Sequence, residues 1–133
     1  MNRNLPLADS TYRLSPSEEL VNSITHGIGL ILSVVGAVIM LSALGRGDVW
    51  RAAGCGVYLA SLITVCAMST MLHSCQVPQW KSCFRALDQG SIYLLIAATF
   101  TPFSLTYLRT GVWWILLGAI WCVAIHGFLA KAL

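Results

Sequence analysis

The sequence predicts an all-α, multi-pass membrane protein with four transmembrane helices. Two observations predict it: the composition and the length of the apolar runs. Of the 133 residues, 57% are hydrophobic and only 10% are charged, whereas a soluble domain carries about 25% charged residues. Four apolar runs are long enough for helices that cross the ~30 Å hydrocarbon core of a bilayer. The expected spans are residues 24–44, 52–72, 90–107 and 112–130.

The charged residues and the cysteines exclude several other classes of protein. The net charge of +3 is small and the basic residues are scattered, unlike the clustered basic residues of nucleic-acid-binding proteins. We therefore expect no nucleic-acid partner, and we consider membrane lipids, a lipid substrate and a homo-oligomer as partners. The five cysteines form no CxxC pair, and their odd number favours ordinary thiols over disulfides or a metal site.

The amino-terminal part divides into a tail and a helix start. Residues 1–14 are polar and mixed, so a short flexible tail is expected before a membrane domain over residues 15–133. Ser15 can cap a helix, Pro16 suits its first position and Glu18 completes a capping box. The first helix is therefore expected to begin here and to continue into the first apolar run.

A polar stripe precedes this first apolar run. Glu19, Asn22 and His26 recur at i, i+3 and i+7, which places them on one helical face. One interpretation is a helix entry that keeps polar groups at the lipid headgroups. Another is a network that faces a functional site from the first helix, and a third makes His26 a substitute metal ligand.

The segment between the second and third apolar runs is amphipathic. Pro78 suits the first position of a short helix within residues 74–87. We expect the apolar face of that helix to lie on the bilayer surface while Lys81 and Arg85 reach headgroups.

The third and fourth apolar runs carry two special residues. Pro102 lies inside the third run and predicts a kink, with Thr99 or nearby backbone absorbing the lost hydrogen bond. His126 lies inside the fourth run, and we expect it to be packed and hydrogen-bonded.

The order of the spans predicts the topology. Four spans place both termini and the central loop on one side of the membrane. That side carries five basic residues and the other side three, which favours cytoplasmic termini and the plasma (inner) membrane. The five are Arg3, Arg13, Lys81, Arg85 and Lys131, and the three are Arg46, Arg51 and Arg109.

Most groups that could carry chemistry lie between Ser69 and Asp88. Ser69 and His73 are four residues apart, which stacks them on one face of a helix, and Asp88 comes where the next apolar run begins. Each has a structural alternative. His73 could bond a free carbonyl at a helix end, Asp88 could cap the next helix, and Ser69 could bond its own helix.

Three segments resemble the hemolysin III family, the bacterial branch of the progestin and adipoQ receptor membrane proteins. They are EELVNSITHGIG (residues 18–29), STMLH (69–73) and RALDQGSIYLLIAATFTPF (85–103), and GAIWCVAIHG (118–127) fits more loosely. The resemblance implies a seven-helix membrane protein with its amino terminus inside and a zinc ion near the cytoplasmic helix ends. It implies three histidine ligands, one from the Ser-x-x-x-His motif and two from a late His-x-x-x-His pair.

Carried onto this chain, the resemblance makes His73 a zinc ligand and Ser69 and Asp88 catalytic residues, with the aspartate associated with zinc-bound water. The late histidine pair has no counterpart in the sequence. We therefore expect a partial zinc site in a chain that corresponds to the first four helices of the family's seven, or to a truncated relative.

The function expected from this constellation is that of a zinc-dependent hydrolase of a lipid amide or ester, or of a receptor-like relative. Zinc lowers the pKa of its bound water to about 7. Asp88 would accept a proton from that water and Ser69 would steady the oxyanion. Whether the chain is an enzyme stays open, because a pore-forming or cytolytic protein and an inactive truncated fragment are the alternatives.

Overall fold

The computed structural model describes residues 14–44 and 47–133, and in these residues the chain is helical apart from short connections. No strand occurs in this part of the chain, which confirms the all-α prediction. The predicted tail up to residue 13, together with Gly45 and Arg46, lies outside the described residues. The helices are α1 (Pro16–Leu44), α2 (Val49–Ser74), α3 (Pro78–Tyr107) and α4 (Gly111–Ala132).

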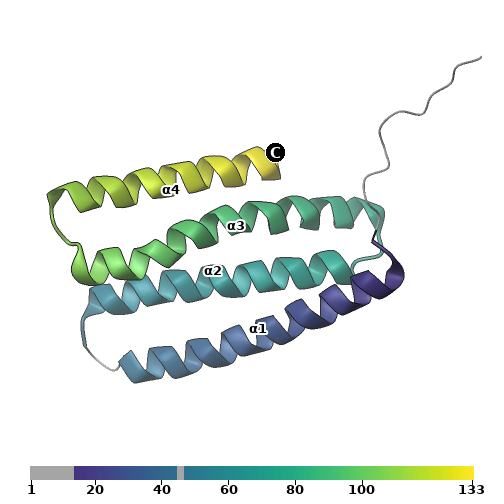
Figure 1. The fold of residues 1–133 in the computed structure, drawn as a ribbon, viewed down its shortest axis with the longest axis horizontal. Helices are drawn as coiled ribbons and strands as arrows, with labels where there is room; N and C mark the ends of the chain where they lie inside the picture. The colour runs from purple at the N-terminus through teal and green to yellow at the C-terminus, as the bar shows by residue number, and fades with distance from the viewer. Residues whose placement is uncertain (1–13, 45–46) are drawn as a thin grey trace, which may run out of the picture.

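The four helices lie side by side in one antiparallel row (Figure 1). Within the described residues, packing contacts between helices join α1 to α2, α2 to α3, and α3 to α4 only. A single row buries little, so the buried hydrophobic side chains are few and mostly small. They are Ala37, Cys55, Leu59, Leu72, Ala97, Ala98, Leu105, Leu117 and Ala124.

Three of the helices, α1, α2 and α4, are long and apolar enough to cross a membrane. Large aliphatic side chains such as Ile31, Val38 and Ile115 are more than half exposed on them, as expected for surfaces that face lipid. The protein is therefore an integral membrane protein. α3 is less apolar because its first turns are polar and hydroxyl residues interrupt the rest, so a span at residues 90–107 stays a prediction.

The predicted start of the first helix is confirmed. The backbone N–H of Ser15 donates to Glu18 Oε2 at 2.7 Å, and the backbone N–H of Glu18 donates to Ser15 Oγ at 3.3 Å. These reciprocal bonds form a capping box. The second helix has a cap of its own, since Asp48 Oδ1 accepts from the N–H of Trp50 at 2.9 Å.

The prediction of a separate surface helix before the third span is wrong. Pro78 does begin a helix, but that helix runs without interruption to Tyr107, so one helix replaces the two that were expected. Gly90, which the sequence suggested as the start of a span, is buried against α4. A Cβ at this position would lie 2.9 Å from the ring of Phe128. Packing against α4, rather than a turn, accounts for this glycine.

Pro102 lies inside α3, and Figure 1 shows that this helix bends in its carboxyl-terminal half, as a proline predicts. Thr99 does not absorb the lost hydrogen bond, because its hydroxyl donates to the carbonyl of Ile96 at 2.7 Å. Gly54 of α2 passes close to the proline, and a Cβ there would lie 2.7 Å from Pro102 Cα. The absence of a side chain at Gly54 thus allows α2 to approach α3 closely at this point.

Candidate functional site

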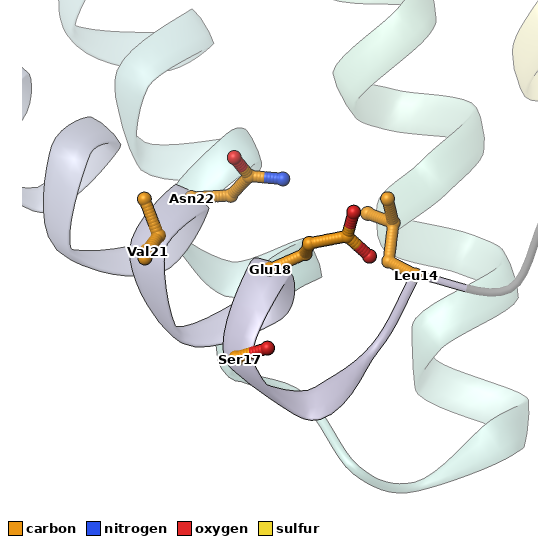
Figure 2. Close-up of a pocket in the computed structure, with 5 residues that line it drawn as sticks. All are labelled: Leu14, Ser17, Glu18, Val21 and Asn22. Carbon is orange, nitrogen blue, oxygen red and sulfur yellow. The ribbon is translucent and has the colours of Figure 1, made fainter.

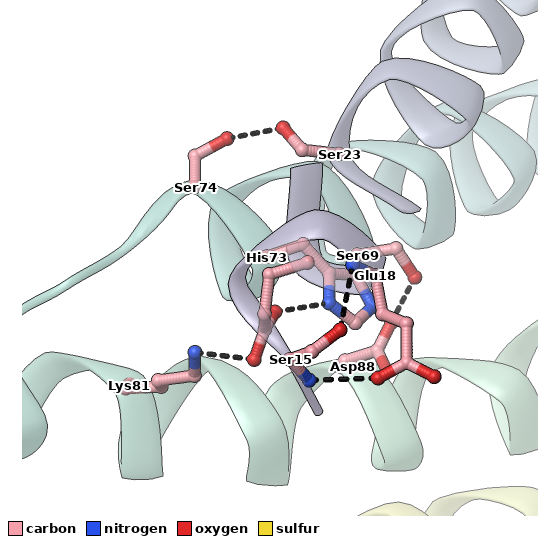
Figure 3. A network of polar contacts seen from close by, with 9 residues as sticks. Ser15, Glu18, Ser23, Ser69, His73, Ser74, Lys81 and Asp88 are labelled. Atoms are coloured by element: carbon pink, nitrogen blue, oxygen red, sulfur yellow. Dashed lines mark hydrogen bonds and ion pairs between the residues drawn. The ribbon is translucent and has the colours of Figure 1, made fainter. Parts of the chain in front are cut away.

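Polar side chains from three helices meet at one end of the row, where α1 begins, α2 ends and α3 begins (Figures 1 and 3). The predicted residues Ser69, His73 and Asp88 all belong to this region. The helix order brings them together, because the short connection of residues 75–77 turns α3 back along α2.

Ser69 and Asp88 form the first contact of the site. The hydroxyl of Ser69 donates to Asp88 Oδ1, and Ser69 is only 5% exposed. Asp88 lies well inside α3, which begins at Pro78, so the alternative in which it caps a helix is wrong. Ser69 does not bond its own helix either, because its hydroxyl is engaged with the carboxylate. The serine therefore orients the aspartate.

His73 forms the second contact, with Glu19 of α1. Its Nδ1 lies 2.7 Å from Glu19 Oε2, and the two side chains are 13% and 16% exposed. The other carboxylate oxygen, Oε1, accepts from Lys81 Nζ of α3 at 2.6 Å. One carboxylate thus ties the ends of three helices together (Figure 3).

His26 lies against the face of the His73 ring. The ring centroids are 5.8 Å apart and the ring planes differ by 8°. A metal bound to an imidazole nitrogen lies near the plane of that ring, and two stacked rings share no such plane. His26 is therefore placed to restrain the orientation of His73 and not to act as a substitute ligand.

The polar stripe of the first helix is divided between two environments. Glu19 and His26 contact His73, which supports the interpretation as a network facing the site. Asn22 instead lines another hollow of about 350 Å³, beside Glu18 (Figure 2). Ser23, which lies between Asn22 and His26 in the sequence, forms a 2.7 Å hydrogen bond with Ser74 at the end of α2.

Lys81 is the functional neighbour that sequence reasoning missed. We expected it to reach headgroups, whereas it is half-buried and paired with Glu19. The sequence did offer a signal, because Glu19 and Lys81 have opposite charges and were predicted on the same membrane face. A hollow of about 560 Å³ opens beside this pair. Its lining residues are Leu14, Pro16, Glu19, Leu20, Ser23, His73, Ser74, Gln76 and Lys81.

The described residues do not fit a complete zinc site. Among them, no group of three or more His, Cys, Asp or Glu side chains gathers closely enough to hold a metal ion. A catalytic zinc usually takes about three protein ligands, and His73 already has Nδ1 committed to Glu19. His126 does not help, because it is exposed on α4 instead of being packed as expected. Zinc binding through His73 therefore stays a prediction.

Comparisons with known proteins agree with the sequence motifs. A family model described as "Haemolysin-III related" matches residues 14–133. The chain is 43% identical to "Hemolysin-3" of Bacillus cereus over 115 residues, which cover 86% of this chain and 52% of that protein. It is 35% identical to "Hemolysin-3 homolog" of Bacillus subtilis (strain 168) over 115 residues, with coverage of 86% and 54%.

A more distant similarity reaches "Monocyte to macrophage differentiation factor" of Homo sapiens. That match is 26% identical over 110 residues and covers 77% of this chain and 44% of the human protein. No solved structure matches the chain. The chain spans about half the length of the relatives that it matches.

Proposed function

The chain belongs to the Haemolysin-III related family of membrane proteins, and from this premise we propose that its polar cluster forms part of a metal-dependent site for a lipid amide or ester. Such a site would serve a hydrolase or a receptor-like relative of one. The observation that carries the proposal is the partly buried contact between Ser69 and Asp88, with His73 one turn further along the helix of Ser69.

Each side chain has a role that follows from its contacts. Ser69 occupies Oδ1 of Asp88, so Oδ2 is the oxygen proposed to take up a proton during hydrolysis. The serine proton is engaged with the aspartate, so the serine acts by orienting the carboxylate. His73 would contribute its second ring nitrogen, since Nδ1 contacts Glu19.

Zinc is a proposed component of this site. When bound, it would supply a Lewis acid that polarises a carbonyl. The described residues provide one histidine and not the usual ligand set, so further ligands would come from outside them.

Metal analysis of the protein purified from membranes tests this proposal. We expect bound zinc in the wild-type protein and at least a tenfold loss in His73→Ala. His126→Ala is the matched control, because His126 is exposed on α4, and it should keep wild-type zinc content. Equal zinc in the wild-type protein and His73→Ala would exclude a metal site at this histidine.

A pore-forming, cytolytic homo-oligomer is the second candidate, since the name "Hemolysin-3" of the Bacillus cereus relative refers to lysis. The single row of helices leaves apolar faces exposed along its length, and such faces could pack between copies. Liposomes loaded with dye separate the candidates. Leakage that rises with protein-to-lipid ratio would support a pore, and retention of dye at a high ratio would remove it.

The proposed location is the plasma (inner) membrane with cytoplasmic termini. Among the described basic residues, Lys81, Arg85 and Lys131 lie at the site end, and Arg51 and Arg109 at the other. Basic residues favour the cytoplasmic side. The remaining basic residues, Arg3, Arg13 and Arg46, lie outside the described residues. Labelling of single cysteines in sealed, oriented vesicles tests this, and site-end cysteines reachable only from outside would reverse the orientation.

A further inference from the structure

We infer that Glu19 is a positioning residue that holds His73 in one tautomer, with hydrogen on Nδ1 and a free lone pair on Nε2. The inference deepens the proposed function, because Nε2 is the atom through which His73 would act there. It rests on three contacts of the described residues, however, and not on a metal.

The first contact fixes the hydrogen. An ionised carboxylate can only accept hydrogen bonds, so the ring nitrogen facing it must be the donor. The Nδ1 to Oε2 distance of 2.7 Å is that of a charge-assisted hydrogen bond. A neutral imidazole carries one N–H, so a hydrogen on Nδ1 leaves Nε2 as an acceptor.

The second contact fixes the carboxylate. Lys81 donates to Oε1 at 2.6 Å, so both oxygens of Glu19 are engaged, one by α2 and one by α3. A carboxylate bonded through both oxygens cannot rotate to release the histidine without breaking the lysine contact as well. This is the arrangement expected of a group that orients a histidine, whose tautomer is set by what its other nitrogen bonds.

The third contact fixes the ring. The His26 imidazole is stacked on His73 with a centroid distance of 5.8 Å, which limits tilting of the His73 ring. Two side chains of α1 thus contact His73, and Lys81 of α3 holds one of them in place. None of these contacts uses Nε2.

A positioning role and a purely structural role for Glu19 predict different behaviour of the His73 tautomer. If Glu19 only linked helices, its loss would reduce stability and leave the tautomer of His73 unchanged. If Glu19 positions the ring, its loss frees the hydrogen to move to Nε2. The tautomer is therefore the quantity to measure.

Nitrogen-15 NMR of histidine-labelled protein in lipid bilayers measures it, at a pH where the ring is neutral. The chain has three histidines, so His26→Gln and His126→Gln assign the His73 signals. In the wild-type protein we expect a protonated Nδ1 and an unprotonated Nε2. In Glu19→Ala we expect loss of this single pattern, with an Nε2–H signal appearing.

Two variants complete the experiment. Glu19→Gln should also give an Nε2–H signal, because an amide has one acceptor oxygen and one donor NH₂. Lys81 can only donate, so the amide oxygen accepts from Lys81 and the NH₂ faces Nδ1 of His73. Glu18→Ala, at the adjacent exposed glutamate that belongs to the capping box, should leave the pattern unchanged. An Nε2–H signal in the wild-type protein would overturn the inference, even if Glu19→Ala does not fold. An unchanged pattern in a folded Glu19→Ala would overturn it too.

The outcome is distinguishable from failure of the proposed function. Absence of zinc in the purified protein would remove the metal proposal but would leave the NMR pattern as expected. A protein that binds zinc through His73 but shows an Nε2–H tautomer would overturn this inference and leave the metal proposal in place.

Discussion

The two ends of the helix row are both polar, but they use their polar side chains differently. At the site end, Ser69 is 5% exposed and donates to Asp88, and Glu19 contacts partners on two other helices. At the opposite end, helices meet through a 3.4 Å ion pair between Arg109 and Asp48, whose side chains are 42% and 35% exposed. One end holds its charges within the helix packing, and the other leaves them at the surface.

This difference supports the proposal that the site end carries the function. The opposite end also has Trp50 and Trp114 packed edge to face at 6.0 Å, which is typical of anchoring at a membrane interface. Burying polar groups costs free energy unless they are bonded. Within the described residues, no buried side-chain nitrogen or oxygen lacks a partner. The hydrogen-bonded network at the site end is compatible with the site proposed there.

The largest loss of stability is expected from Ser69→Ala. If this substitution had no effect, the contrast between the two ends of the row would fail. The substitution removes the donor to the Asp88 carboxylate in a partly buried contact. Hydrogen bonds to charged groups contribute ~1.5–3 kcal/mol, so we expect the free energy of unfolding to fall by ~2 kcal/mol. Thermal unfolding of the purified protein in detergent measures the change.

Ser82→Ala is the matched control for this prediction. The hydroxyl of Ser82 is exposed and bonds the carbonyl of Gln79 within its own helix. Its loss should change stability by less than ~0.5 kcal/mol. Equal effects of the two serines would show that the site end is no more dependent on its hydrogen bonds than the helix surface.

A somewhat smaller loss is expected from Gly54→Ala, which tests whether the opposite end depends on the close approach of α2 and α3. The new Cβ would lie 2.7 Å from Pro102 Cα, which is backbone that cannot move aside easily. Overpacking costs ~1–3 kcal/mol, and better helix propensity offsets ~0.5–1 kcal/mol of it. We expect a net loss of ~1–2 kcal/mol in the unfolding free energy.

Gly56→Ala on the same helix has the opposite expectation. A Cβ at Gly56 would meet nothing within 4 Å, so only the propensity gain of ~0.5–1 kcal/mol remains. Unfolding of the two variants side by side separates contact from propensity. A gain in both would mean that α2 and α3 can separate at no cost.

Much of this fold could be predicted because the information is local. Apolar runs predicted helices, and Ser15, Pro16 and Glu18 predicted where the first one starts. The continuity of α3 could not be predicted in this way. Gly90 resembles the boundary of a span in the sequence, but the need for it arises from Phe128 on another helix.

The site was predicted only in part, because its contacts join residues that are far apart in the sequence. The topology placed His73 and Asp88 on one membrane face, whichever face that is. The contact of Ser69 with Asp88 depends on α3 beginning at Pro78, which presents the aspartate from inside a helix. The pairing of Glu19 with Lys81 joins residues 62 positions apart, and periodicity within one helix cannot reveal such a pair.

A modest loss of stability is expected from Lys81→Ala at the site end. The lysine bonds Glu19 Oε1 at 2.6 Å and is 24% exposed. Because part of the pair is screened by solvent, we expect a loss of ~0.5–1 kcal/mol in the unfolding free energy. Lys131→Ala, at an exposed position at the end of α4, is the control and should have no measurable effect.

The smallest effect is expected from Arg109→Ala at the opposite end. This variant removes the ion pair with Asp48 but keeps Asp48 as the cap of α2. Exposed ion pairs contribute ~0–1 kcal/mol, so the loss should stay below ~0.5 kcal/mol and should shrink further at high salt. Measuring Arg109→Ala and Lys81→Ala at low and high salt compares the two ends directly. If Arg109→Ala costs more than Lys81→Ala, the charges at the opposite end hold the helices together more strongly, and the contrast between the ends fails.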